Sequence, residues 1–219
     1  MLNYNRFLAA SAAVLCGTHV LTAELYVDPL ADEATGNSNL DLTEVSVTND
    51  ADSLFIDITT STFEDWTKYL VFLDYEAGGI SGNSNPWFRN VEMGANGIDA
   101  FAGIWVDNGG GIDTHANDDS DWFGQGLGSF VGINGSTVSI EFSLDVLGIG
   151  VGDVVKFDVG TSGGGNGDPA TDLLSVGSTA ASWGGVATAG ELRSYTIVPA
   201  PGALALLGLA GVIARRRRA

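Results

Sequence analysis

The stretch TEVSVTNDADSLFIDITT, residues 43–60, contains two short runs of apolar residues separated by a polar segment. Val45 and Val47 alternate with polar residues in the first run, and Leu54, Phe55, Ile56 and Ile58 form the second. This alternation is typical of β-strands with one buried face. Asn, Asp and Ala at positions 49–52 favour a tight turn. The stretch therefore predicts an antiparallel hairpin.

Similar short runs recur between Glu24 and Val198, whereas helical periodicity is nearly absent there. One helical turn is predicted at Ser143–Gly148, and no repeat of 20–50 residues favours a solenoid or propeller. Eight to ten short strands in one domain predict an all-β fold, a single antiparallel β-sandwich of the jelly-roll kind. Besides the hairpin, the predicted strands are 69–73, 98–106, 129–133, 138–142, 154–159 and 193–198.

The first 23 residues have the layout of a secretory signal peptide. Arg6 precedes an apolar run over residues 7–15, and Thr22 and Ala23 supply small residues for a cut after position 23. The alternative is an uncleaved membrane helix, but the apolar run is shorter than the roughly 20 residues that a bilayer requires. A bulky Leu15 directly before Cys16 argues against lipid attachment there.

The other end of the chain has the layout of a membrane anchor. Residues 202–214 are all apolar or glycine, and four arginines follow at positions 215–218. Arginine is costly in hydrocarbon and is retained on the cytoplasmic side, so Arg215, Arg216, Arg217 and Arg218 predict a membrane stop. An amphipathic surface helix is disfavoured because the run is apolar all round, with its charge at one end.

Residues 198–219 resemble the PEP-CTERM sorting signal, which combines a short proline motif, a membrane helix and a basic tail. The motif here is Val198, Pro199, Ala200 and Pro201, with Ala200 where the family usually has Glu. The resemblance implies an exosortase, a membrane transpeptidase, as processing partner. It also implies an exported protein of the cell envelope or outer surface, anchored at least transiently in the membrane.

The segment between the two ends is strongly acidic. All 27 acidic residues lie there, against four basic residues, Lys68, Arg89, Lys156 and Arg193, so its formal charge is −23. Such a surface repels nucleic acid, which we exclude as a partner, and attracts divalent cations. Adaptation to salty surroundings would explain the same charge. The segment has no cysteine and therefore no disulfide.

The domain predicted at residues 24–197 is also similar to the glucodextranase C-terminal domain, family-9 carbohydrate-binding modules and DOMON-type sandwiches. The similarity begins at Asp28-Pro29, Asp32 and Asp41-Leu42-Thr43. It continues through Phe72-Leu73-Asp74, Asn85-Pro86-Trp87, Ile104-Trp105-Val106, Thr161-Ser162-Gly163-Gly164 and Asp168. It implies a β-sandwich that binds sugar, such as an extracellular polysaccharide, with structural Ca²⁺ as an option.

Clustered aspartates are the candidate metal ligands. Calcium requires six to eight oxygen ligands, which Asp-rich loops supply. Asp28, Asp32 and Asp41 converge if the first strand returns beside the second, and Asp168 and Asp172 flank another loop. Four more aspartates crowd residues 113–121. The competing interpretation is that these residues are solvated turn formers.

Five tryptophans supply candidate sugar-binding residues, because sugar C–H faces stack on aromatic rings while polar side chains bind hydroxyls. Trp87 and Phe88, with Asn85 and Arg89 beside them, occupy a polar loop, and Trp122 lies in the most acidic loop. Packing is the alternative for each. Trp66 and Trp105 fall within or beside strand patterns, which favours the core.

The sequence gives little support for catalysis, and we predict that the protein is not an enzyme. His115 is the single histidine after the signal peptide, which disfavours a histidine zinc site or a catalytic triad. Two of the many carboxylates would always reach a glycosidase spacing by chance. Three hypotheses remain: a glycan-binding module, a structural envelope or matrix component, and a glycoside hydrolase.

Overall fold

The computed structural model describes residues 23–178 and 180–200, which belong to one compact unit. Apart from Ala23, the predicted signal peptide lies outside the described residues. So do Pro201, the apolar stretch and the four arginines, whereas Val198, Pro199 and Ala200 are described. Among the residues the structure describes, no helix is both long and apolar enough to cross a membrane.

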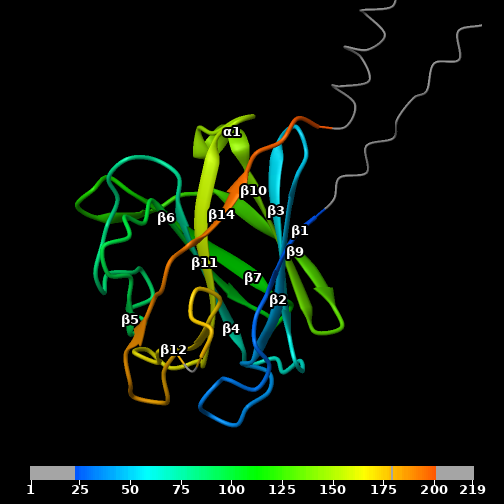
Figure 1. Cartoon of the computed structure of the whole chain (residues 1–219), viewed down its shortest axis with the longest axis vertical. Helices are drawn as coiled ribbons and strands as arrows, with labels where there is room; N and C mark the ends of the chain where they lie inside the picture. The colour runs from blue at the N-terminus through cyan, green and yellow to red at the C-terminus, as the bar shows by residue number, and fades with distance from the viewer. Residues whose placement is uncertain (1–22, 179, 201–219) are drawn as a thin grey trace, which may run out of the picture. The chain divides into compact units, whose positions relative to one another are not determined.

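The described residues form an all-β, β-sandwich-like fold with one helical turn (Figure 1). The first sheet has the order β1-β2-β3-β10-β9, with bounds Glu24–Val27, Leu42–Asn49, Ser53–Thr60, Thr137–Ser143 and Gly128–Asn134. The second has the order β12-β11-β4-β6-β7-β8, and β14 also pairs with β11. Its bounds in that order are Ala170–Leu173, Val154–Ser162, Lys68–Asp74, Ala100–Trp105, Gly111–Asn117 and Trp122–Gly124, with β14 at Arg193–Thr196.

The predicted hairpin is confirmed as β2 and β3. Val47 is paired with Ile56 and Val45 with Ile58, and the alternate positions of both strands are buried. At the turn, Asp50 Oδ1 accepts the backbone N–H groups of Asp52 and Ser53. The side-chain period of two places every apolar residue of the hairpin except Phe55 on the buried face.

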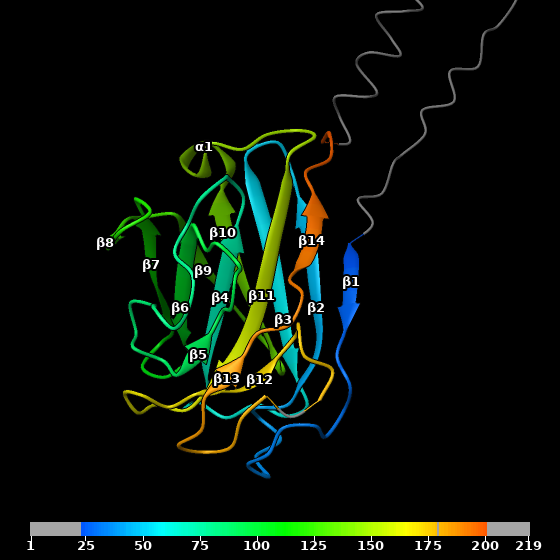
Figure 2. The ribbon, with the colours of Figure 1, turned by 60° about the vertical axis from the view of Figure 1, so that its left-hand side comes forward.

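The main core lies between the two sheets. The strand β4 has apolar side chains on both of its faces. Tyr69, Val71 and Leu73 pack in the core shared with the first sheet. Leu70 and Phe72 point to the other face, into a second apolar cluster that includes Phe101. Loops cover the outer face of the second sheet (Figure 2). Both faces of β4 are therefore buried, which explains why its apolar run is continuous rather than alternating.

The predicted helical turn is confirmed as α1, Leu144–Leu147. The Ser143 hydroxyl accepts the N–H of Val146, and Gly148 closes the turn with a φ of 71°. Ser at the N-cap and Gly in the left-handed conformation after the last residue are the usual helix ends.

Six strands lie outside the predicted set: β1, β7, β8, β12 and the parallel pair β5, Val91–Glu92, with β13, Ala187–Thr188. Most have two to four residues, too few to show a period. The longest, β7, has the sequence GIDTHAN, in which polar residues hide the alternation. The parallel pair is also a departure from the purely antiparallel fold predicted.

Candidate functional site: an aromatic pocket and a buried aspartate cluster

A pocket of about 520 Å³ opens where the loop after β4 crosses the second sheet. Its walls combine three aromatic rings with charged and amide side chains. The lining residues are Lys68, Pro86, Trp87, Phe88, Arg89, Trp105, Asp107, Asn108 and Asn166. They come from the start of β4, the loop before β5, the end of β6 with the β6–β7 turn, and the loop between β11 and β12.

Two glycines in neighbouring strands make room for the two indole rings. A Cβ at Gly103 in β6 would lie 2.2 Å from the Trp87 ring, and one at Gly111 in β7 would lie 2.2 Å from the Trp105 ring. The ring centroids of Trp87 and Trp105 are 6.4 Å apart. The absence of side chains at these two positions therefore lets the tryptophans approach the strands closely.

Hydrogen bonds fix the orientation of Trp87. Its Nε1 donates to Asp113 Oδ2 at 3.0 Å, and the same oxygen lies 3.0 Å from His115 Nε2. Burial raises the pKa of Asp113, but the neighbouring His115 side chain and the hydrogen bond from Trp87 outweigh it and lower the pKa overall. Asp113 thus remains an acceptor for the indole N–H, and the ring keeps one edge on the sheet.

Asn85 shapes the loop that carries the aromatic residues. Its amide donates to the Arg89 carbonyl at 2.8 Å and its Oδ1 accepts the Arg89 N–H at 2.9 Å. Phe88, inside this closed loop, has a φ of 52° and a side chain that is 77% exposed. A bulky residue in the left-handed region is strained, and such strain is often found at ligand-binding sites.

The structure separates the predicted sugar-binding residues. Trp87, Phe88 and Arg89 line the pocket, while buried Asn85 lies behind them and lines a smaller neighbouring hollow. Trp122 does not line the pocket: its Nε1 donates to Ser84, and its ring packs edge-on against Phe101. Sequence reasoning missed Trp105, Lys68 and Asp107, and it assigned Trp105 to the core because the residue ends a strand.

A second feature is a group of three aspartates whose carboxylate oxygens lie within 4.8 Å of one another. Asp28 follows β1, Asp32 lies in the next turn, and Asp172 belongs to β12. Both views show the loop after β1 beside β12 at the same end of the molecule (Figures 1 and 2). The pairing of β1 with β2 meets the condition under which the sequence analysis brought Asp28 and Asp32 together, whereas the approach of Asp172 depends on tertiary packing.

The Asp28 carboxylate is buried and accepts no hydrogen bond from the described residues. The residue is 2% exposed, and neither of its oxygens has a hydrogen-bond partner among the described residues. Burial, with the neighbouring Asp172 and Asp32 charges, raises the pKa of Asp28 to about 8. Burial also raises the pKa of Asp172 to about 7, although its oxygens accept the N–H groups of Leu42 and Leu173.

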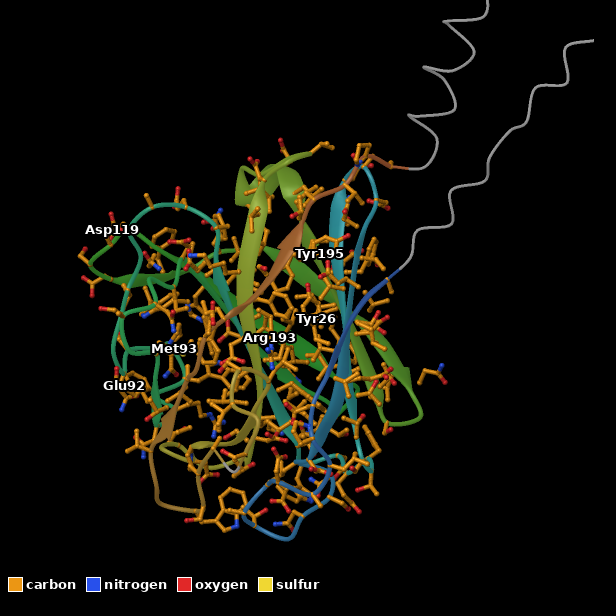
Figure 3. The ribbon with its side chains drawn as sticks, viewed as in Figure 1. Tyr26, Glu92, Met93, Asp119, Arg193 and Tyr195 are labelled. Carbon is orange, nitrogen blue, oxygen red and sulfur yellow. The ribbon has the colours of Figure 1, made fainter. Side chains whose placement is uncertain are left out.

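These groups fit a hard cation. Three close carboxylates supply anionic oxygens, and the uncompensated Asp28 needs a positive partner. Arg193, beside Tyr26 in Figure 3, offsets the charge on Asp28 only in part, and its Nε and Nη2 donate to the Leu174 carbonyl. The three aspartates could therefore hold Ca²⁺, with water or backbone oxygens completing its ligands.

The other predicted metal ligands have different partners. Asp41 Oδ1 accepts the Ala31 N–H at 2.8 Å, and its Oδ2 accepts the Ser61 hydroxyl, so this residue holds the turn that carries Asp32. Asp168 lies on the pocket side, where its Oδ2 accepts the Gly165 N–H. In the acidic loop, Asp118 Oδ1 accepts three bonds from residues 120 and 121, as a turn former does, and Asp119 is on an outer loop (Figure 3).

No family model, curated protein or solved structure matches the chain. The resemblances to the PEP-CTERM signal and to the carbohydrate-binding sandwiches therefore stay predictions. The geometry of the pocket and of the aspartate cluster is what the structure offers toward a function for the described domain.

Proposed function

We propose that this protein is a non-catalytic, surface-displayed module that binds glycan in the pocket formed by Trp87, Phe88 and Trp105. The observation that supports this proposal most directly is the pocket's combination of three aromatic rings with five charged or amide side chains. Aromatic faces bind the C–H faces of sugar rings, and the amides and charged groups serve as partners for hydroxyls.

Rigidity of the pocket supports the same proposal. Trp87 is held by Gly103 beneath it and by Asp113 at its edge, and Phe88 is presented by a loop that Asn85 closes. Rings held in place before binding lose little conformational entropy when a sugar stacks on them. A polar loop that only covered the sheet would not require an aromatic side chain in a strained, exposed position.

We also propose that Ca²⁺ binds Asp28, Asp32 and Asp172 as a structural ion. The ion would tie the loop after β1 to β12, and so connect the edge of the first sheet to the edge of the second. The ion would stabilise the fold rather than take part in ligand binding, because none of the three aspartates lines the pocket.

Export and sorting belong to this proposal as well. A cleaved signal peptide at residues 1–23 and an exosortase-processed signal at residues 198–219 would place a jelly-roll-like domain outside the cell. Edman sequencing of the secreted product should begin at Glu24. A mature product that retains residues 1–23 in the cytosol would contradict this part of the proposal.

Two alternatives have distinct tests. A structural matrix component would show no binding on a glycan array, while a hydrolase would release product from chromogenic glycosides. Asp107 is the one carboxylate among the described residues that line the pocket, so the pocket lacks the carboxylate pair that glycoside hydrolysis uses. We therefore rank the binding module first.

Phe88→Ala should weaken glycan binding by about tenfold without lowering the melting temperature, because the ring is exposed and its loss removes stacking area. The measurement is titration calorimetry of the full chain with the best glycan from an array. Phe123→Ala is the matched control, since Phe123 is 45% exposed and lies outside the pocket. Equal losses for the two variants would remove the pocket from consideration.

A further inference from the structure

Two of the four basic residues of the described domain line the same pocket. Lys68 and Arg89 are both lining residues, whereas Lys156 and Arg193 lie elsewhere. Asp107 is the one acidic residue of the lining, so the pocket walls carry a net charge of one positive unit within a strongly acidic domain. The net charge of the pocket lining is thus opposite in sign to that of the domain, which favours an anionic ligand.

Arg89 is a buried cation that makes no ion-pair contact among the described residues. The residue is 5% exposed, and no carboxylate lies within ion-pair distance of it among the described residues. Its Nη1 donates to the Gly165 carbonyl at 2.5 Å and to the Ser162 hydroxyl at 3.4 Å, both neutral acceptors. Its Nε has no hydrogen-bond partner in the described part of the chain, and burial lowers the pKa of the guanidinium.

The acidic groups near Arg89 each have another partner as well. Asp168, the closest acidic influence on Arg89, uses Oδ2 to accept the Gly165 N–H. Asp107 is paired with Lys68, Nζ to Oδ1 at 3.1 Å. The Lys68 ammonium has three N–H donors, and one is used in this pair. The lining therefore keeps a net positive charge. Lys68 and Arg89 also keep N–H donors that make no hydrogen bond to the described residues, beside the aromatic rings.

We infer that the glycan bound by this pocket is acidic, and that its anionic group, a carboxylate of the uronic-acid type, lies against Lys68 and Arg89. This inference rests on the proposed glycan-binding function. Ammonium and guanidinium groups bind carboxylates through charge-assisted hydrogen bonds, while the sugar ring stacks on Trp87 or Phe88. A sulfated sugar would offer the same charge through different chemistry, and the experiment separates the two.

The Lys68–Asp107 pair allows a test with variants of opposite sign. Asp107→Asn should tighten the binding of an oligogalacturonate about threefold, because it removes a competing negative charge from the pocket. Lys68→Gln should weaken it by about the same factor. For a neutral oligosaccharide of equal length, where each variant removes only a hydroxyl partner, the two variants should not shift the affinity in opposite directions. A sulfated oligosaccharide provides the third arm.

A second ion pair supplies the controls. Lys156 and Asp74 lie 3.1 Å apart and do not line the pocket. Lys156→Gln and Asp74→Asn therefore change the net charge equally and should leave all three affinities unchanged. If both pairs of variants shift binding alike, the effect comes from global charge and the inference is wrong.

The outcomes of the ligand series also separate this inference from the proposed function. Tighter binding of the uronate than of the sulfated and neutral sugars supports the inference. Equal or better binding of the neutral sugar overturns the inference and leaves the glycan-binding function standing. Preference for the sulfated sugar overturns the carboxylate assignment. If none of the three binds and no array glycan does, the proposed function itself is wrong.

Discussion

Millimolar Ca²⁺ should raise the melting temperature of the full chain at pH 8 by about 10 °C over its value in chelator. A ligand at about a thousand times its dissociation constant stabilises the folded state by about 4 kcal/mol, and each kcal/mol is worth about 2–4 °C in a domain of this size. The physical reason is the buried Asp28 carboxylate, which lies beside Asp32 and Asp172 and has no hydrogen-bond partner among the described residues. The measurement is circular dichroism during heating, with and without the ion.

Asp28→Asn should change two properties together, the melting temperature in chelator and the response to Ca²⁺, whereas loss of an aspartate that does not bind the ion would leave the response unchanged. The variant should melt higher than the parent protein in chelator at pH 8, because it removes a buried charge, and should lose most of the response to Ca²⁺. Asp168→Asn is the control and should keep the full response, since Asp168 is bound to Gly165 away from the cluster. Identical melting curves of the parent in Ca²⁺ and in chelator would end the calcium proposal.

The pH dependence in chelator has a definite sign. The pKa values of Asp28, Asp172 and Asp158 are raised to about 8, about 7 and about 6, in each case chiefly by burial. The folded state therefore holds protons that the unfolded state releases near pH 4, and stability falls as pH rises from about 4 to 8. We expect the melting temperature in chelator to drop over this range, and Ca²⁺ to remove most of that drop. A melting temperature that rises with pH in chelator would contradict this assignment.

Local patterns in the sequence predicted much of the sheet framework, because alternation is a property of each strand alone. The hairpin at 43–60 and the doubly covered strand at 69–73 are examples, and each contains enough apolar residues to show which faces are buried. The strand β1 did not stand out, since three of its four residues are exposed. Strands of two to four residues are formed by the packing around them, so their own composition carries little signal.

The candidate site was predicted only in part, for a similar reason. Asp28, Asp32 and Trp87 are marked by local motifs, whereas Asp172 joins the cluster across the gap between the two sheets. Trp105 looked like a core residue because it ends an apolar strand, yet its ring leaves the core to lie over Gly111. The pairing of Trp105 with Gly111 across β6 and β7 is a matter of register, which no pattern within one strand reveals.

Trp87→Ala should reduce glycan affinity by at least about thirtyfold, since central aromatic residues of a binding site contribute about 2 kcal/mol or more. Titration calorimetry of the full chain with the best-bound array glycan measures the loss. Trp122→Ala is the matched control: Trp122 also packs against Phe101 but does not line the pocket, and its removal should leave affinity unchanged. Loss of binding in the Trp122 variant alone would move the site to the acidic loop.

Gly103→Ala tests whether the position of the ring, rather than its presence, determines binding. The added methyl group would lie 2.2 Å from the Trp87 ring, so the ring must move off β6, and affinity should fall nearly as far as in Trp87→Ala. Overpacking should also lower the free energy of unfolding by about 1–3 kcal/mol. In the Trp87→Ala background, Gly103→Ala should cause little loss of stability, because the ring that it would clash with is gone. A double-mutant cycle, measured by thermal melting and by glycan binding, gives the coupling energy between the two substitutions. Additive effects in the cycle would show that Gly103 acts on the sheet independently of Trp87, and the pocket would then not depend on this contact.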